Sequence, residues 1–258
     1  MHKSTFECRR GSLTIRGTEY RPDGENLPIA IVCHGFMANQ GTVRRYAKAL
    51  AEMGCAAYCF DFCGGCVIGG KSDGKTTDMS VLSEVADLIT VIAHVKSLPY
   101  TDASRVTLMG CSQGGFVAAL TAARLKNTVS RLILFYPALC IPDDARAGRM
   151  MFARFDPANI PETFRCGPMK LGRRYAADVL DMDPFAEIAP YQGPVLIVHG
   201  DQDAIVNVSY AERANNAYIA RRTTPAPVKL IILKGAGHGF SRKADERAME
   251  AIRNFAAK

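Results

Sequence analysis

The sequence predicts an α/β fold in which a mainly parallel sheet carries helices on both faces. Short continuous apolar runs alternate along the chain with longer segments whose apolar residues recur at helical spacing. Runs of the first kind are typical of strands buried on both faces, and their alternation with helices is typical of a doubly wound sheet. The chain has 258 residues, 48% of them hydrophobic, which suffices for one large domain with a full core.

Two extended segments, residues 6–10 and 12–20, flank Gly11 and predict an N-terminal hairpin. Six later apolar runs predict the core strands, at residues 29–33, 55–60, 106–109, 131–136, 195–198 and 228–233. The amphipathic segments between them predict helices at residues 42–53, 79–97, 114–126, 209–221 and 244–257. We therefore expect a sheet of about eight strands that binds its ligand at their carboxyl ends.

The alternation breaks once, between Tyr136 and Pro194. This segment carries several prolines, a basic run and only short helical patterns. A structureless loop of that length is unusual inside a compact domain. We expect residues 137–193 to form an inserted cap subdomain within a single domain that spans residues 1–258.

The segment Gly110-Cys111-Ser112-Gln113-Gly114 lies between an expected strand and an expected helix. A Gly-x-Ser-x-Gly sequence in this context forms a sharp turn that lifts the serine hydroxyl above the edge of the sheet. The turn is too tight for side chains on both sides of the serine, which explains the glycines. Ser112 is therefore the candidate nucleophile, and it requires a later acid and histidine.

Both groups follow in the required order. His238 comes after the strand at 228–233 and is the candidate general base. Two carboxylates after the strand at 195–198 compete to orient it. Asp201 lies close to the strand, where aspartates often shape turns, whereas Asp203 lies further into the loop and can reach toward the next one. The residues alone separate these two alternatives weakly.

An acyl-transfer site also needs donors for the oxyanion. The backbone amide of Gln113, next to the serine, is one candidate, and that of Phe36, in the loop after the first core strand, is the other. We interpret His34 in the same loop and His199 beside the acid as structural histidines.

No metal-ligand spacing and no glycine-rich dinucleotide motif is present, so we expect neither a metal nor a cofactor. Nine cysteines, an odd number in a long chain, predict free and mostly buried thiols. Cys63-Gly64-Gly65-Cys66 lacks a second ligand pair or a thioredoxin-like context. We interpret it as part of a glycine-rich loop.

The formal net charge is +7, with arginine-rich segments at residues 146–154, 165–174 and 221–222. Aromatic residues that would indicate a nucleic-acid site are not interleaved with them, so we interpret these segments as solvated surface. No signal-peptide core is found at the N-terminus, and no apolar run approaches membrane-spanning length. We expect a cytoplasmic protein without nucleic-acid or membrane partners; a homodimer is compatible with the sequence.

Taken together, the motifs resemble those of the α/β-hydrolase superfamily. They are His34-Gly35-Phe36, Gly110 to Gly115, His199 to Asp203 and Gly237-His238-Gly239-Phe240. Within the superfamily the chain is most similar to small bacterial cinnamoyl and feruloyl esterases, which also share its segments at residues 60–65 and 77–82. The resemblance covers nearly the whole chain. It implies an α/β-hydrolase fold and favours Asp203, the second aspartate of the family's motif, as the triad acid.

The resemblance further implies a serine carboxylesterase that hydrolyses hydroxycinnamate or related aryl and short acyl esters through an acyl-Ser112 intermediate. The expected partner is a small-molecule ester. In the family, polar side chains of the cap bind the ring hydroxyl of an aromatic acyl group. By position, Asp144 and Tyr175 are the residues expected to do so here.

Three other functions are compatible with these motifs. A monoacylglycerol-type lipase would be expected to have a broader apolar cap than this arginine-rich one. Prolyl-peptidase catalytic domains carry similar motifs but usually an added propeller, for which 258 residues leave no room, so a peptidase would be a small one. A catalytically idle receptor would usually lose a triad or oxyanion residue, whereas this chain retains all of them.

Overall fold

The computed structural model of the chain describes residues 1–256. Its central sheet has eight strands in the order β1-β2-β4-β3-β5-β6-β11-β12. Only β2 runs opposite to its neighbours, and all other adjacent strands are parallel. The strands are β1 (His2–Arg10), β2 (Leu13–Arg21), β3 (Leu27–Cys33), β4 (Ala56–Phe60), β5 (Thr101–Cys111), β6 (Val129–Phe135), β11 (Val195–Gly200) and β12 (Val228–Leu233). The sheet confirms the predicted α/β-hydrolase fold.

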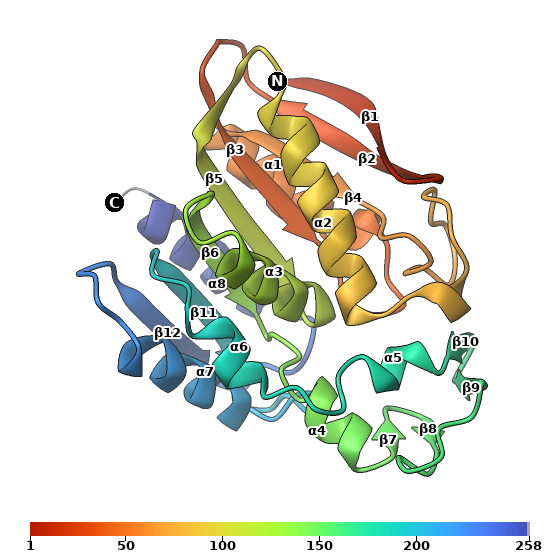
Figure 1. Cartoon of the computed structure of the whole chain (residues 1–258). Coiled ribbons are helices and arrows are strands. Elements are labelled where there is room, and N and C mark those ends of the chain that lie inside the picture. Colours follow the sequence, from red (N-terminus) through yellow and green to blue (C-terminus); the bar gives the residue numbers. More distant parts are fainter. Residues whose placement is uncertain (257–258) are drawn as a thin grey trace.

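Helices cover both faces of this sheet (Figure 1). On one face lie α1 (Arg44–Glu52) and α8 (Arg242–Ala256), whose apolar side chains belong to one buried cluster. On the other face α2 (Val81–Lys96), α3 (Gln113–Arg124), α6 (Pro184–Ile188) and α7 (Ser209–Ala220) contribute to a second buried cluster. Two cores separated by the sheet are what a doubly wound fold requires.

Local sequence explains where these elements lie. The residues of β3 from Ile29 to Cys33 are completely buried, as an apolar run in the middle of a parallel sheet should be. Ser80 is the N-cap residue of helix α2 and forms a reciprocal capping box with Ser83. The long helices begin and end within two residues of their predicted bounds. The predicted last residue of α8, Ala257, lies outside the described residues.

Residues 137–193, which we call the insert, connect β6 to β11. Apart from α6, which packs on the sheet face, its helices and strands lie beyond the carboxyl ends of the parallel strands (Figure 1). Besides α6, the insert contains α4 (Ile141–Arg146), α5 (Arg174–Ala177), the β7–β8 hairpin (Arg149–Met150 and Ala153–Arg154) and the β9–β10 hairpin (Thr163–Cys166 and Met169–Gly172). The sequence predicted only short helical patterns here. Strands of two to four residues are too short for alternation to reveal them.

Two predictions about side chains can be compared directly with the structure. All nine cysteines are free and most are buried, as expected. Arg146 is exposed, as predicted, but its Nη1 also donates to the carbonyl oxygens of Leu180 and Met182 at 2.8 and 3.0 Å. Arg146 therefore ties two parts of the insert together.

Residues 1–256 contain no helix with the length and hydropathy needed to cross a membrane.

A buried hydrogen-bond chain joins the core to the insert. Tyr175 of α5 donates its hydroxyl to Oε1 of Gln113 at 2.6 Å, and Nε2 of Gln113 donates to Glu84 of α2 at 2.8 Å. All three side chains are almost inaccessible to solvent. Burial raises the pKa of Glu84 to about 8, although the hydrogen bond from Gln113 opposes the shift. Glu84 is therefore largely protonated in the folded protein at neutral pH.

This pKa predicts a pH-dependent stability. Because the pKa of Glu84 is higher in the folded chain than in the unfolded one, its contribution to stability is complete below pH 4.5 and is lost as the pH rises to about 8. Glu84→Gln removes this titration, so the variant should gain free energy of unfolding relative to the wild type between these pH values. Urea denaturation at several pH values would measure the gain, and Glu52→Gln, an exposed change on α1, is the control. A pH-independent difference between Glu84→Gln and the wild type would contradict a buried, titrating Glu84.

Candidate active site

Ser112 lies at the turn between β5 and α3 in a strained backbone conformation, with φ of 55° and ψ of −123°. Close backbone packing holds the turn. A Cβ atom on Gly110 would come within 2.1 Å of the carbonyl oxygen of Gly114, and one on Gly114 within 2.2 Å of that of His34. The Ser112 N–H also donates to the Phe135 carbonyl at 2.9 Å. The glycines are therefore required by space, as the motif predicted.

Ser112 belongs to a chain of hydrogen bonds with the two residues singled out in the sequence. The Oγ of Ser112 lies 3.0 Å from Nε2 of His238, and Nδ1 of His238 lies 2.8 Å from Oδ2 of Asp203. Because a carboxylate only accepts, Nδ1 carries the proton and Nε2 is free to accept from the serine hydroxyl. The ring of Tyr136 packs against the imidazole, with centroids 4.7 Å apart.

The carboxylate of Asp203 is buried but well supplied with donors. Its Oδ1 accepts from the N–H groups of Ile205 and Val206, each at 2.9 Å. Burial favours the neutral acid, yet hydrogen bonds from His199, His238 and the Val206 amide outweigh burial and hold the pKa of Asp203 well below its usual range. Asp203 is therefore ionised throughout the neutral pH range.

Asp201 and His199, which precede Asp203 in the same segment, form hydrogen bonds with groups other than His238. Asp201, the alternative acid, accepts from the N–H of Gly235 at 2.6 Å and so joins the ends of β11 and β12. Nε2 of the fully buried His199 lies 2.9 Å from the Val206 carbonyl and 3.3 Å from Oδ2 of Asp203. Its Nδ1 has no partner among the described residues. The structure thus brings Asp203, rather than Asp201, to His238.

The two expected oxyanion donors flank the serine. Gln113 is the first residue of α3, where backbone N–H groups have no partner within the helix. Phe36 lies in the loop after β3, and within residues 1–256 its N–H has no hydrogen-bond partner. This loop packs directly on the turn, since a Cβ atom on Gly35 would come within 3.0 Å of the Cβ of Ser112.

The side chain of His34 lies beneath that loop and hydrogen-bonds to backbone groups. It is fully buried, its Nδ1 lies 2.8 Å from the Gly35 carbonyl, and its Nε2 accepts from the Phe62 N–H at 3.2 Å. The potential metal-ligand atoms of His34, Asp61 and Cys66 lie within 4.8 Å of one another, close enough to bind one metal ion together. However, the Asp61 carboxylate already accepts from Lys71 and twice from Gln40. Protein hydrogen bonds therefore account for the cluster.

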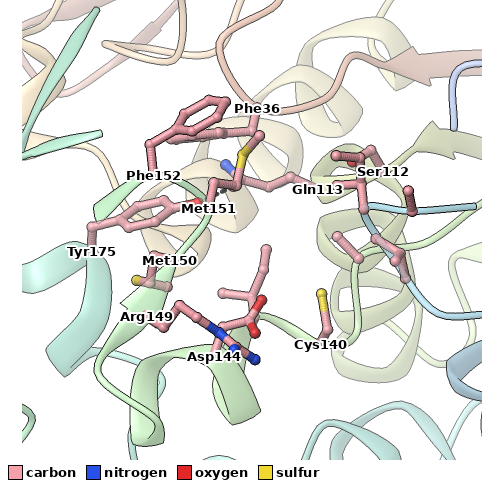
Figure 2. A pocket seen from close by; sticks show the side chains of 15 residues that line it. Phe36, Ser112, Gln113, Cys140, Asp144, Arg149, Met150, Met151, Phe152 and Tyr175 are labelled. Atoms are coloured by element: carbon pink, nitrogen blue, oxygen red, sulfur yellow. Dashed lines mark hydrogen bonds between the residues drawn. The ribbon is translucent and has the colours of Figure 1, made fainter. Parts of the chain in front are cut away.

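A cavity of about 320 Å³ extends from Ser112 toward the insert (Figure 2). The rings of Phe36 and Tyr175 stack at its wall with centroids 5.2 Å apart. Asp144 also lines the cavity, and burial raises the pKa of its carboxyl group. The structure thus places both cap residues expected from the resemblance, Asp144 and Tyr175, at the cavity that Ser112 reaches.

Part of this wall was not predicted from the sequence. Arg149, Met151 and Phe152, from the β7–β8 hairpin, line the cavity as well. They lie in the arginine-rich segment that was interpreted as solvated surface. The two strands of this hairpin have only two residues each, too few for a periodic pattern, so only the folded chain reveals these three side chains.

The arrangement can perform acyl transfer. A serine hydroxyl hydrogen-bonded to a neutral imidazole is the geometry of an activated nucleophile, and an ionised carboxylate on the far nitrogen favours the imidazolium that forms. Free backbone N–H groups next to the serine can stabilise a developing oxyanion.

Comparisons with known proteins agree with the fold. The structure of Est1E from Butyrivibrio proteoclasticus with ferulic acid bound superposes with a TM-score of 0.87 at 27% identity, covering 98% of this chain and 100% of that one. Mouse alpha/beta hydrolase domain-containing protein 10 superposes with a TM-score of 0.74 at 18% identity, covering 98% of both chains.

Two curated sequences are also similar. The monoacylglycerol lipase of Mycolicibacterium smegmatis is 20% identical over 263 residues, covering 92% of this chain and 90% of that protein. The human acylamino-acid-releasing enzyme is 23% identical over 222 residues, which are 85% of this chain but only 30% of that protein.

Residues 24–163 match the sequence profile Hydrolase_4, described as serine aminopeptidase, S33. More than half of the chain lies within that match, and the fold and the strained serine turn agree with it. The chain therefore belongs to the Hydrolase_4 (serine aminopeptidase, S33) family of α/β-hydrolases, with an esterase- or lipase-like serine-hydrolase architecture.

Proposed function

We propose that the protein is a cytoplasmic serine carboxylesterase that hydrolyses hydroxycinnamate or related aryl and short acyl esters. Ser112, His238 and Asp203 are its catalytic triad. The observation that carries the proposal is the hydrogen-bonded chain from Ser112 through His238 to Asp203, with the cavity beneath the insert opening onto the serine.

In the first half of the reaction, Oγ of Ser112 attacks the ester carbonyl carbon while its proton passes to Nε2 of His238. The carbonyl oxygen becomes an oxyanion that the N–H groups of Phe36 and Gln113 stabilise. The intermediate then collapses. The bond from the carbonyl carbon to the alcohol oxygen breaks, and the proton on His238 passes to that oxygen. The alcohol departs, and the acyl group remains bonded to Oγ of Ser112.

In the second half, water takes the place of the alcohol. His238 accepts a proton from the water as its oxygen attacks the acyl carbon, and a second oxyanion forms in the same position. Collapse breaks the bond to Oγ, the proton returns to Ser112, and the carboxylic acid leaves. Asp203 remains ionised throughout and stabilises the imidazolium.

The insert acts in this proposal as a cap over the acyl group. The flat, aromatic wall formed by Phe36 and Tyr175 fits a planar ring. A phenol hydroxyl on that ring would donate to the carboxylate of Asp144 or to the oxygen of Tyr175, whose own proton is already donated to Gln113. The similar Est1E structure was solved with ferulic acid bound, which supports this choice of acyl group.

A lipase is the second candidate, and one observation favours it. Met151, Phe152 and Ile205 line the cavity and yet are 42%, 71% and 50% exposed. Large apolar side chains at the mouth of a cavity suit a long acyl chain. The similarity to a monoacylglycerol lipase points the same way. A panel of methyl ferulate and p-nitrophenyl esters of increasing acyl length would separate the candidates.

Covalent labelling tests the proposed function itself. A fluorophosphonate probe should label the protein once, on Ser112, and Ser112→Ala should take up no label, because the probe forms a bond only with an activated serine. If the wild type took no label and failed to hydrolyse p-nitrophenyl acetate, the proposal would be wrong.

We expect Asp203→Asn to lower kcat by several orders of magnitude, because an asparagine amide would favour the wrong tautomer of His238. Asp201→Asn, its matched control in the same loop, should retain most of the activity. Steady-state kinetics on p-nitrophenyl acetate would measure both variants. A larger loss in Asp201→Asn would reverse the assignment of the acid.

Tyr175→Phe should reduce the preference for hydroxylated over plain cinnamate esters, since it removes the oxygen that would accept from the phenol. The ratio of kcat/KM for methyl p-coumarate to that for methyl cinnamate would measure this preference. An unchanged ratio would show that Tyr175 has no part in recognising the ring hydroxyl.

A further inference from the structure

A second cavity, of about 370 Å³, opens onto Ser112 next to the one beneath the insert. Its walls come from the loop after β3, from the residues before and within α1, and from the loop that carries His238. Ser112 and Phe36 line both cavities, whereas His238 lines only the second. The serine thus lies at the junction of two distinct spaces.

The position of His238 decides which half of an ester enters each space. The imidazole must give its proton to the departing oxygen, so that oxygen must lie within hydrogen-bond reach of Nε2. Gln113, one of the proposed oxyanion donors, lines only the cavity beneath the insert. An ester bound with its leaving oxygen toward His238 and its acyl group beneath the insert satisfies both requirements.

Arg45 places a guanidinium group, paired with Asp245, at the wall of the second cavity. Its Nε lies 3.0 Å from Oδ2 of Asp245, and its Nη2 donates to the Tyr46 hydroxyl at 2.8 Å. Tyr46 in turn donates to Oδ1 of Asp245 at 2.5 Å. The guanidinium is therefore held in place although its side chain is half exposed, and Nη1 has no partner among the described residues.

No carboxylate is found among the described side chains that line this cavity. Asp245 contacts Arg45 but does not form part of the wall. A held arginine with an unused nitrogen recognises a carboxylate better than a neutral group. The net charge of +7 would also draw an anionic substrate toward the protein.

We propose that the cavity lined by Arg45 and His238 binds the alcohol half of the ester and selects an alcohol that carries a carboxylate. This inference rests on the proposed esterase function and names a substrate class for the same site. Arg45 acts in it as a specificity-determining residue that touches the leaving group and takes no part in proton transfer.

A matched pair of esters tests the proposal. The ferulate esters of glycolic acid and of glycolamide share the acyl group and the size of the alcohol but differ in charge. We expect Arg45→Met to lower the ratio of kcat/KM for the glycolate ester to that for the glycolamide ester by about three- to tenfold, the range for a half-exposed charge pair. Comparing this ratio across variants cancels the intrinsic reactivity of the two esters.

Arg44→Met is the control, because Arg44 is the exposed neighbour of Arg45 and does not line the cavity. It should leave the ratio unchanged. In the wild type, added salt should lower the ratio without any mutation, which keeps the test valid if Arg45→Met does not fold. A ratio that Arg45→Met leaves unchanged overturns the inference. If that variant does not fold, a ratio that salt leaves unchanged overturns it.

Failure of the underlying function has a different signature. In that case the wild type would hydrolyse neither ester, nor p-nitrophenyl acetate, and a fluorophosphonate would not label Ser112. Hydrolysis of both esters with a ratio independent of Arg45 would leave the esterase proposal standing and refute only the charge selection.

Discussion

The positive φ of Ser112 is the constraint on which the rest of the site depends. A serine in this conformation is strained, and the strain persists only because the surrounding backbone leaves the turn no other path. Three chain segments meet there: the turn itself, the loop after β3 that carries Gly35, and the end of β6, whose Phe135 carbonyl accepts from Ser112. The turn and the chain at the end of β3 pack so closely that a single extra carbon at Gly110 or Gly114 would collide with backbone. Rigid backbone thus fixes the hydroxyl before any substrate arrives.

Different segments of the fold contact Ser112 from different sides and supply different parts of the site. The carboxyl ends of β11 and β12 supply Asp203 and His238, whose hydrogen bonds need no contribution from the insert. The insert builds one cavity, and the loops near α1 build the other. Chemistry and specificity therefore rest on different segments, so that the insert and Arg45 can vary without disturbing the proton path.

Much of this could be predicted from the sequence, for physical reasons that differ from element to element. Strands such as β3 are buried on both faces and so appear as continuous apolar runs, and the serine turn needs its glycines whatever surrounds it. The relation of Asp203 to His238 was less certain, since either aspartate could fit the spacing. Contacts formed across distant segments left no sequence signal. Hydrogen bonds from Tyr175 to Gln113 and from Gln113 to Glu84 join residues far apart in the sequence, as does the ion pair between Arg45 and Asp245. The short strands of the insert lack periodicity.

The central claim is that one strained serine, at the junction of two cavities, takes up the acyl group of the ester, and detection of a trapped acyl-enzyme tests it most directly. The protein would be mixed with p-nitrophenyl acetate, quenched in acid within the first turnover and digested. Mass spectrometry would then measure the masses of the peptides. The account predicts one acetyl group on the peptide that contains Ser112 and none in Asp203→Asn at the same time point. Rapid hydrolysis with the Ser112 peptide unmodified would contradict it, as would an acetyl group instead on the thiol of Cys140, which also lines the cavity beneath the insert.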